Sequence, residues 1–332
     1  MSNSSTTSIQ SIVDEINTLG ELMPVLPSGG YSAVSAVATA NRIRKILLGQ
    51  RFTWKFNRMV CPAFYTNSYQ QDYAQIGLTA LAWLENANWV DINSTSQPKP
   101  QYPIEAVRDL PLTSWTGNPP GKMCWYPNSQ LSQGQWPGAN QTYTTPIGAN
   151  QTPSNPPTNI LDANGNILVL TTYGVTGETA PVLPANSSDG TTVADGSCVW
   201  TVAGPNSIGF RLVPMPPQQG VVYQINSYGQ MKPPANFTKL GDFINPFPDE
   251  YSHHFTDGFI AFAYQLSPNP KMQELFERKQ QSWLASIAAS FTQGDREIDN
   301  AGFIPDRSAM APGGGTDIGP AMPYLYNVWP GR

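Results

Sequence analysis

The chain has 332 residues, with 18 basic and 23 acidic side chains and a formal net charge of −5. Only 12% of the residues are charged, against about 25% in an ordinary soluble domain, whereas 32 prolines and 28 glycines favour turns and loops. An acidic, charge-poor chain is a poor clamp for nucleic acid, because affinity for phosphate depends on Lys and Arg. A membrane span is not expected either, since there is no run of about 18 apolar residues.

The first residues have neither the basic region nor the apolar stretch of a secretory signal, so we expect synthesis in a cytosol. Cys61, Cys124 and Cys198 are odd in number and far apart, which predicts buried, reduced thiols. A surface with few charges to desolvate can bury a large area against other proteins. The composition therefore favours a subunit of a large assembly.

Two helices are predicted near the start of the chain. Thr7 or Ser8 is a candidate N-cap for a helix that ends near Gly20, and apolar residues recur at helical spacing from about Tyr31 to Leu48. Short aromatic and apolar runs follow between residues 52 and 110, and they are too brief for periodicity to distinguish strand from helix.

Residues 123–161 contain no charged side chain, which is typical either of a loop that orders on assembly or of a disordered linker. Strands are predicted at 166–173, 197–202, 209–213 and 221–227, with turn-forming pairs such as Asn164-Gly165 and Asp195-Gly196. A small all-β module is expected at about residues 159–205.

The strongest helical periodicity lies late in the chain, where two apolar faces are interrupted by Pro268 and Pro270. After Phe303 the chain has no periodicity but keeps aromatic residues that another surface can bury. The predicted helical core residues are Phe259, Phe262, Leu275, Phe276, Trp283 and Ile287.

Because the predicted helices lie at both ends, we expect them to pack together. The predicted fold is α+β: a helical body from the N- and C-terminal helices, a large β-rich central insertion and an extended C-terminal tail. The expected domains are residues 1–110 with 230–302 for the body, 111–229 for the insertion and 303–332 for the tail.

No residue set predicts catalysis, a cofactor or a metal. His253, His254 and Asp257 form H-H-x-x-D, a candidate metal or general-base site, but a capping or interface role is favoured because adjacent residues point about 100° apart on a helix. The glycines at 313–315 lack the Lys-Ser/Thr of a phosphate loop. Carboxylate pairs such as Asp249-Glu250 favour helix N-terminal turns over glycoside hydrolysis. We therefore expect a protein that is not an enzyme.

Two further patterns keep alternatives open. The aromatic residues between Phe52 and Trp89 are either a sugar-binding platform or, as we prefer, buried core and subunit contacts. The one basic cluster is either a solvated helix face or a surface towards DNA or an acidic partner. It comprises Arg42, Arg44, Lys45, Arg51, Lys55 and Arg58.

Residues 174–200 read GVTGETAPVLPANSSDGTTVADGSCVW, with a G-x-T-G-x-T-x-P opening and a G-x-T-V-x-D-G-x-x-x-W close. This segment resembles a small β module that recurs in structural proteins of tailed bacteriophages. The order of a helical start, a β-rich middle and the late pair DGFIAFAYQLSPNPKMQELFERKQQSWLASIAA resembles the head-to-tail adaptor proteins of short-tailed phages. The middle of this chain is much longer than in the smallest adaptors.

The resemblance implies a non-enzymatic virion protein at the head–tail interface, assembled in the host cytoplasm. It implies a homo-oligomeric ring, a dodecamer in that family, that joins the portal protein to tail nozzle or fibre proteins. Double-stranded DNA would pass through its lumen without sequence specificity, and no membrane is involved. Tyr324, Tyr326 and Trp329 are the predicted portal-docking residues.

Two other function classes remain. A tail or fibre-associated receptor-binding protein would contact host glycans through the central β module. A particle hydrolase is the third class, although no acid, base or nucleophile set in the sequence favours it.

Overall fold

The structure is a computed structural model that describes residues 5–18, 33–49, 52–96, 98–144, 156–217, 222–266, 271 and 274–288. The chain divides into two compact units, residues 1–11 with 32–252 and residues 12–31 with 253–332. The predicted tail at 303–332, with Tyr324, Tyr326 and Trp329, lies outside the described residues.

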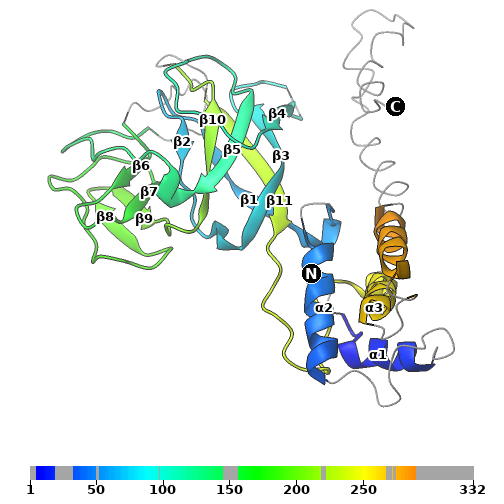
Figure 1. Ribbon diagram of the computed structural model, residues 1–332. Helices are drawn as coiled ribbons and strands as arrows, with labels where there is room; N and C mark the ends of the chain where they lie inside the picture. The colour runs from blue at the N-terminus through cyan, green and yellow to red at the C-terminus, as the bar shows by residue number, and fades with distance from the viewer. Residues whose placement is uncertain are drawn as a thin grey trace, which may run out of the picture. The chain divides into compact units, whose positions relative to one another are not determined.

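The first unit is built around a seven-stranded sheet (Figure 1). Neighbouring strands are antiparallel except for the parallel pair β4 and β5. In spatial order the strands are β1 (Arg58–Tyr65), β11 (Tyr223–Met231), β3 (Leu81–Asp91), β4 (Tyr102–Ala106), β5 (Lys122–Pro127), β10 (Ile208–Val213) and β2 (Asp72–Tyr73).

This sheet is curled, so that its two edge strands approach each other across the core. Phe64 on β1 lies with its ring centroid 4.9 Å from that of Tyr73 on β2 and 5.7 Å from that of Phe210 on β10. These rings belong to one buried cluster with Leu81, Met123 and other apolar residues of the inner face. The curl therefore encloses the main hydrophobic core of the unit.

A second, four-stranded antiparallel sheet lies within residues 159–202. Its order is β6 (Asn159–Leu161), β7 (Ile167–Thr172), β9 (Cys198–Val202) and β8 (Thr192–Asp195). Trp200 is fully buried in its core and meets the ring of Tyr143 edge-on at 5.7 Å. A separate core of this kind indicates a small β module.

The helices are α1 (Ile9–Thr18), α2 (Ala33–Leu47) and α3 (Ser252–Leu266), and residues 274–288 are also helical. Ser8 is confirmed as the N-cap of α1, because its hydroxyl accepts a hydrogen bond from Ser11 N–H at 3.1 Å. Short 3-10 turns occur at Lys55–Asn57, Leu78–Ala80, Asn128–Gln130 and Asp249–Tyr251. None of the helices in the described ranges is long and apolar enough to cross a bilayer.

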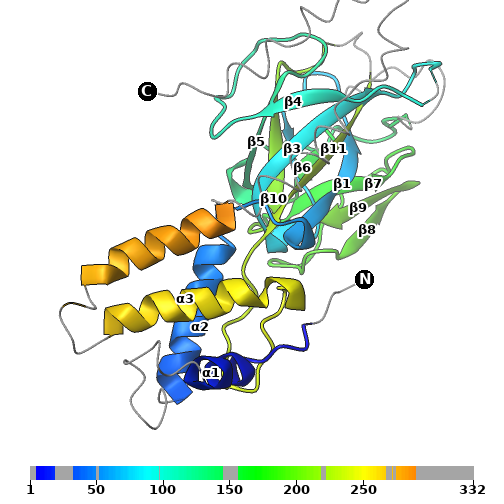
Figure 2. The same cartoon turned by 90° about the vertical axis from the view of Figure 1, so that its right-hand side faces the viewer.

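In the second unit, helix 274–288 runs beside α3 (Figure 2). The ring of Phe262 meets Trp283 edge-on at 6.1 Å and lies 5.9 Å from Phe276. Thr256 on α3 donates a hydrogen bond of 3.3 Å to Glu15 on α1. Residues 12–18, 253–266 and 274–288, which come from distant parts of the sequence, therefore belong to one helical unit.

The predicted fold class is wrong. The structure is mainly β-sheet and is not a helical body that carries a β-rich insertion, because strands β1 to β4 arise from the segment assigned to the helical body. Strand β3 explains much of the error. Register shifts against β11 bury Leu81, Leu84 and Ala87 at every third position. That spacing imitates a helix and hides the two-residue period of a strand.

Candidate functional site

The structure places most of the predicted helical core residues in the interior of the second unit. Phe259, Phe262, Trp283 and Ile287 are buried, and the indole N–H of Trp283 donates to the carbonyl oxygen of His254 at 2.8 Å. Phe276 is half-buried. Leu275 differs from the prediction, because it is 39% exposed at the position next to the buried face.

The two histidines lie in the first turn of α3, as the sequence predicts. Burial, reinforced by the charge of neighbouring His253, lowers the pKa of His254 to about 4. Among the described residues no three His, Cys, Asp or Glu side chains are grouped so that they could hold a metal ion. The three cysteines are buried and reduced, as predicted.

The basic cluster is divided by the fold. Arg44 is buried, donates to the carbonyl oxygen of Ala235 at 2.6 Å and lies over the ring of Phe237. Burial lowers the pKa of Arg44 to about 10. Arg58 pairs with Glu85. At least two of the six basic side chains are therefore used within the fold.

Several residues of the motif at 174–200 hold the small β module together. Asp195 is buried and accepts hydrogen bonds from the indole N–H of Trp136 at 2.9 Å, the indole N–H of Trp200 at 3.1 Å and the N–H of Gly177 at 2.7 Å. Gly196 has φ +63°, and a Cβ there would overlap the carbonyl oxygen of Val175. These motif residues therefore stabilise the packing of the small β module.

A hollow of about 390 Å³, lined mainly by residues with polar side chains together with Leu112, Pro157 and Met215, lies on the first unit, and we call it the amide pocket. Its lining comes from five separate stretches of chain, near residues 68–72, 112–113, 132–134, 157–159 and 215. The polar and aromatic lining residues include Tyr69, Gln70, Gln71, Thr113, Ser132 and Asn159.

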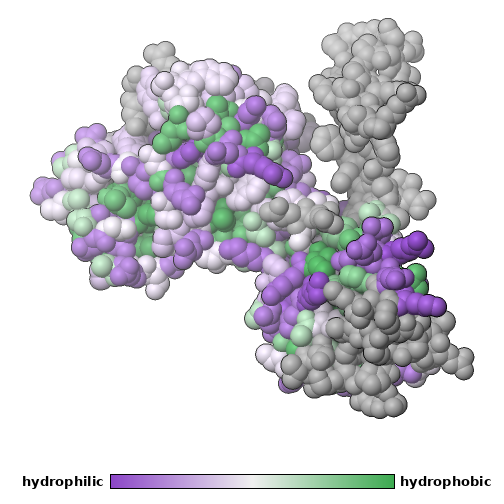
Figure 3. Space-filling view, viewed as in Figure 1, coloured by the Kyte–Doolittle hydropathy of each residue, from purple (hydrophilic) through white to green (hydrophobic). Residues whose placement is uncertain are grey.

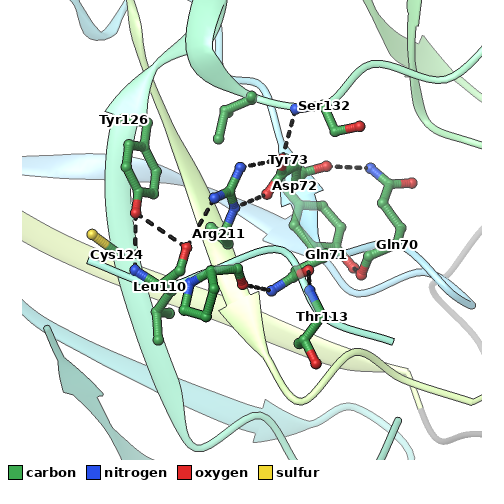
Figure 4. Close-up of polar contacts among 12 residues, drawn as sticks. Gln70, Gln71, Asp72, Tyr73, Leu110, Thr113, Cys124, Tyr126, Ser132 and Arg211 are labelled. Carbon is green, nitrogen blue, oxygen red and sulfur yellow. Dashed lines mark hydrogen bonds and ion pairs between the residues drawn. The ribbon is translucent and has the colours of Figure 1, made fainter. Parts of the chain in front are cut away.

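A buried ion pair supports the floor of this pocket (Figure 4). The guanidinium of Arg211 donates to both carboxylate oxygens of Asp72, at 2.6 and 2.8 Å, and the exposed fractions of the two side chains are 9% and 2%. Arg211 also donates to the carbonyl oxygen of Leu110, and the N–H of Ser132 donates to Asp72 at 2.6 Å. The hydrogen bonds to Asp72 raise the pKa of Arg211. The pair ties β2, β10 and two loops together.

Carboxamides surround this ion pair. Gln70 accepts hydrogen bonds from Thr158 N–H at 3.0 Å and donates to the backbone carbonyl of Asp72 at 2.9 Å and to Asn159. Gln71 accepts from Thr113 N–H and donates to the carbonyl oxygen of Pro111, both at 3.0 Å. The amide groups are therefore fixed before any ligand arrives.

Tyr69 stands at the rim of the pocket. Its side chain is 56% exposed and its φ is +53°, in the left-handed region that tyrosine rarely adopts. Most of the other aromatic rings between Phe52 and Trp89 are buried or half-buried. This burial agrees with the interpretation of these rings as core residues. The sequence contains no distinct signal for the pocket apart from the run Gln70-Gln71-Asp72.

The surface agrees with the charge-poor composition. On the face in view, strongly hydrophilic residues form small patches separated by pale and apolar surface over the β-rich unit (Figure 3). Comparison of the chain with protein-family models, with curated proteins and with solved structures finds no match.

Proposed function

We propose that this chain is a structural virion subunit whose copies form a ring between the portal and the tail, and that DNA passes through the ring. The observation that carries the proposal is the second unit, in which the described residues 12–18, 253–266 and 274–288 come together from distant parts of the sequence. In the adaptor family that the sequence resembles, helices build the ring and an extended C-terminal segment reaches the portal.

The physical properties of the chain favour such a role. A ring buries large lateral interfaces, and a surface with few charges loses little hydration free energy when it is buried. A net charge of −5 lets duplex DNA pass a lumen without adhering to it. Under this proposal each subunit contacts neighbouring copies of itself, the portal protein, and the nozzle or fibre proteins.

The test is assembly with portal rings of the same virus, followed by negative-stain electron microscopy. The intact chain should add a ring below the portal. A chain truncated after Phe303 should keep its cooperative urea unfolding transition and fail to attach, because it lacks the aromatic residues that we propose as anchors. Attachment of the truncated chain at the intact level would reject the docking role of the tail.

A finer variant separates the anchors from the length of the tail. Replacing Tyr324, Tyr326 and Trp329 together by alanine keeps the chain length and should weaken portal attachment as much as the truncation does. Replacing three polar residues of the same segment by alanine is the control and should leave attachment unchanged. If the intact chain forms neither rings nor portal complexes, the adaptor proposal itself is rejected.

A further inference from the structure

We propose that the amide pocket of the β-rich unit binds a small, uncharged saccharide. The hollow of about 390 Å³ lies within the range of about 300–1,000 Å³ that is typical of small-molecule sites. The proposal goes beyond the ring function and does not depend on it, because every lining residue belongs to the first unit.

The charges at the pocket exclude ionic ligands. Among the described residues that line the pocket, Asp72 alone carries a charge, and its carboxylate already accepts two hydrogen bonds from Arg211 and one from Ser132 N–H. A phosphate, sulfate or carboxylate would approach this carboxylate without a free cation to compensate it. An ammonium group would have to compete with a bidentate guanidinium. A neutral ligand carries neither cost.

The lining offers both donors and acceptors. Carboxamides and hydroxyls each donate and accept, which matches ligands whose neighbouring hydroxyl groups do the same. Within the part of the chain that the structure describes, Gln71 uses one of its two Nε2 hydrogens, on Pro111, and the hydroxyl of Thr113 accepts from Trp115 N–H at 3.1 Å and keeps its own hydrogen to donate. These groups remain available to a polyhydroxylated ligand.

The pocket is organised in advance. The Asn159 amide donates to Gln133 at 2.7 Å and to the carbonyl oxygen of Ser132 at 3.1 Å, while Gln70 is held by Thr158 and by Asp72. Side chains that are already ordered lose little entropy when a ligand binds. A sugar buries little apolar surface and therefore gains little hydrophobic free energy on binding. A low entropic cost in the protein is then needed for measurable affinity.

Tyr69 supplies an aromatic surface at the rim. It occupies the third position of a tight turn that Gln70 N–H closes onto the carbonyl oxygen of Asn67 at 3.3 Å, where its positive φ favours glycine. A side chain with a Cβ is strained in this conformation, so holding tyrosine there costs free energy. A strained, exposed ring beside a polar pocket points to a binding role, and a ring face can cover the apolar face of a sugar.

The test uses the full chain and a panel of neutral mono- and disaccharides, with sialic and glucuronic acid as charged counterparts, followed by isothermal titration calorimetry and ligand-observed NMR. At least one neutral saccharide should bind with a dissociation constant of about 1 mM or lower. The charged counterparts should bind at least about tenfold more weakly, a difference of about 1.4 kcal/mol.

Two variants locate the site. Tyr69→Gly removes the ring and relieves the positive φ, so it should leave the fold at least as stable and weaken binding about tenfold or more. Ser132→Trp fills the pocket from an exposed position and keeps the backbone bonds of residue 132, so it should abolish binding. The matched control is Tyr102→Ala, which removes another exposed ring, on β4, and should leave binding unchanged.

Three results would overturn the proposal: no neutral saccharide bound at about 50 mM, preference for the charged sugars, or binding that persists in both pocket variants. Ring assembly with the portal is measured in a separate experiment. Absence of sugar binding therefore does not affect the adaptor proposal, and failure of ring assembly does not affect the saccharide proposal.

Discussion

Asp72 and Arg211 form a buried, bidentate ion pair, and two neighbouring loops hydrogen-bond to it. The two charges are removed from water, so each relies on the other and on the N–H of Ser132 and the carbonyl oxygen of Leu110 for compensation. Tyr126 completes the cluster, because its ring lies under the guanidinium at 4.7 Å. Burial raises the pKa of Tyr126 to about 12, so its hydroxyl stays a donor.

Breaking this pair should be costly. Asp72→Asn leaves the guanidinium of Arg211 buried without a counter-charge and should lower the free energy of unfolding by about 3–5 kcal/mol. Urea titration followed by tryptophan fluorescence measures the change. The matched control is Glu105→Gln, which breaks the solvent-exposed pair with Lys122 and should cost no more than about 1 kcal/mol. Equal effects from the two variants would contradict the structural role of the buried pair.

The carboxylate of Asp249 should give the fold a defined pH dependence. It accepts hydrogen bonds from the hydroxyls of Ser5, Thr6 and Thr7 and from two of their backbone N–H groups. These bonds hold the pKa of Asp249 well below its usual range. The contribution of Asp249 to the free energy of unfolding is therefore complete above its pKa of about 4 in the unfolded chain. It is lost as the pH falls towards the lower pKa of the folded state.

Urea midpoints measured from pH 6 down to about pH 2 test this linkage. The intact chain should lose stability more steeply with acid than Asp249→Asn, whose amide does not titrate. Glu178→Gln, at an exposed glutamate of the same unit, should follow the intact chain. Parallel curves for the intact chain and Asp249→Asn would show that the Asp249 contacts do not form in solution.

At the scale of elements, the small β module depends on its turns. Gly196 joins β8 to β9 with a positive φ and lies against the backbone of Val175 and Thr176. Gly196→Ala should cost more than about 2 kcal/mol, because strain in φ adds to a backbone overlap. Hydrogen exchange should show lost protection in β8 and β9. The control Gly241→Ala meets no atom within 4 Å and should stay within about 0.5 kcal/mol.

Elements with strong local signals were predictable. The helix after Ser8, the second helix and the strands near residues 167–172, 198–202 and 208–213 all follow from periodicity, capping and turn residues. The strands between residues 58 and 106 were not predictable, because bulges in β3 disturb the period and its partners are distant in sequence. β5 begins at Lys122 and extends into residues 123–161, the stretch without charged side chains. Its pairing with β10 is through backbone hydrogen bonds, which do not require charges, so the composition did not reveal this strand.

The amide pocket was not predictable for a related reason. Gln70 and Asn159 are 89 residues apart, and glutamine and asparagine carry no individual signal in a chain rich in polar residues. Only the curled sheet and the second module bring them together. The aromatic residues between Phe52 and Trp89 stand out in the sequence, but the exposure of Tyr69 depends on the turn and cannot be predicted from the pattern.

At the scale of the whole molecule, two units with separate interiors should respond separately to mutation. Trp283→Ala removes a large buried ring from the helical unit and should destabilise that unit by about 3–5 kcal/mol. Hydrogen exchange should lose protection in 253–288 and keep it in β10 and β11. Leu275→Ala, at an exposed position of the same helix, should change neither unit by more than about 0.5 kcal/mol. Simultaneous loss of protection in both units would contradict the division.

We propose above that many copies of this chain surround a common axis. Electron microscopy of the purified full chain, alone and with portal rings, tests it most directly, because class averages viewed down the axis reveal both closure and copy number. We expect closed rings with a central opening that dock coaxially on the portal. Particles that remain single subunits under both conditions, or that sit at the tip of a fibre, would contradict it.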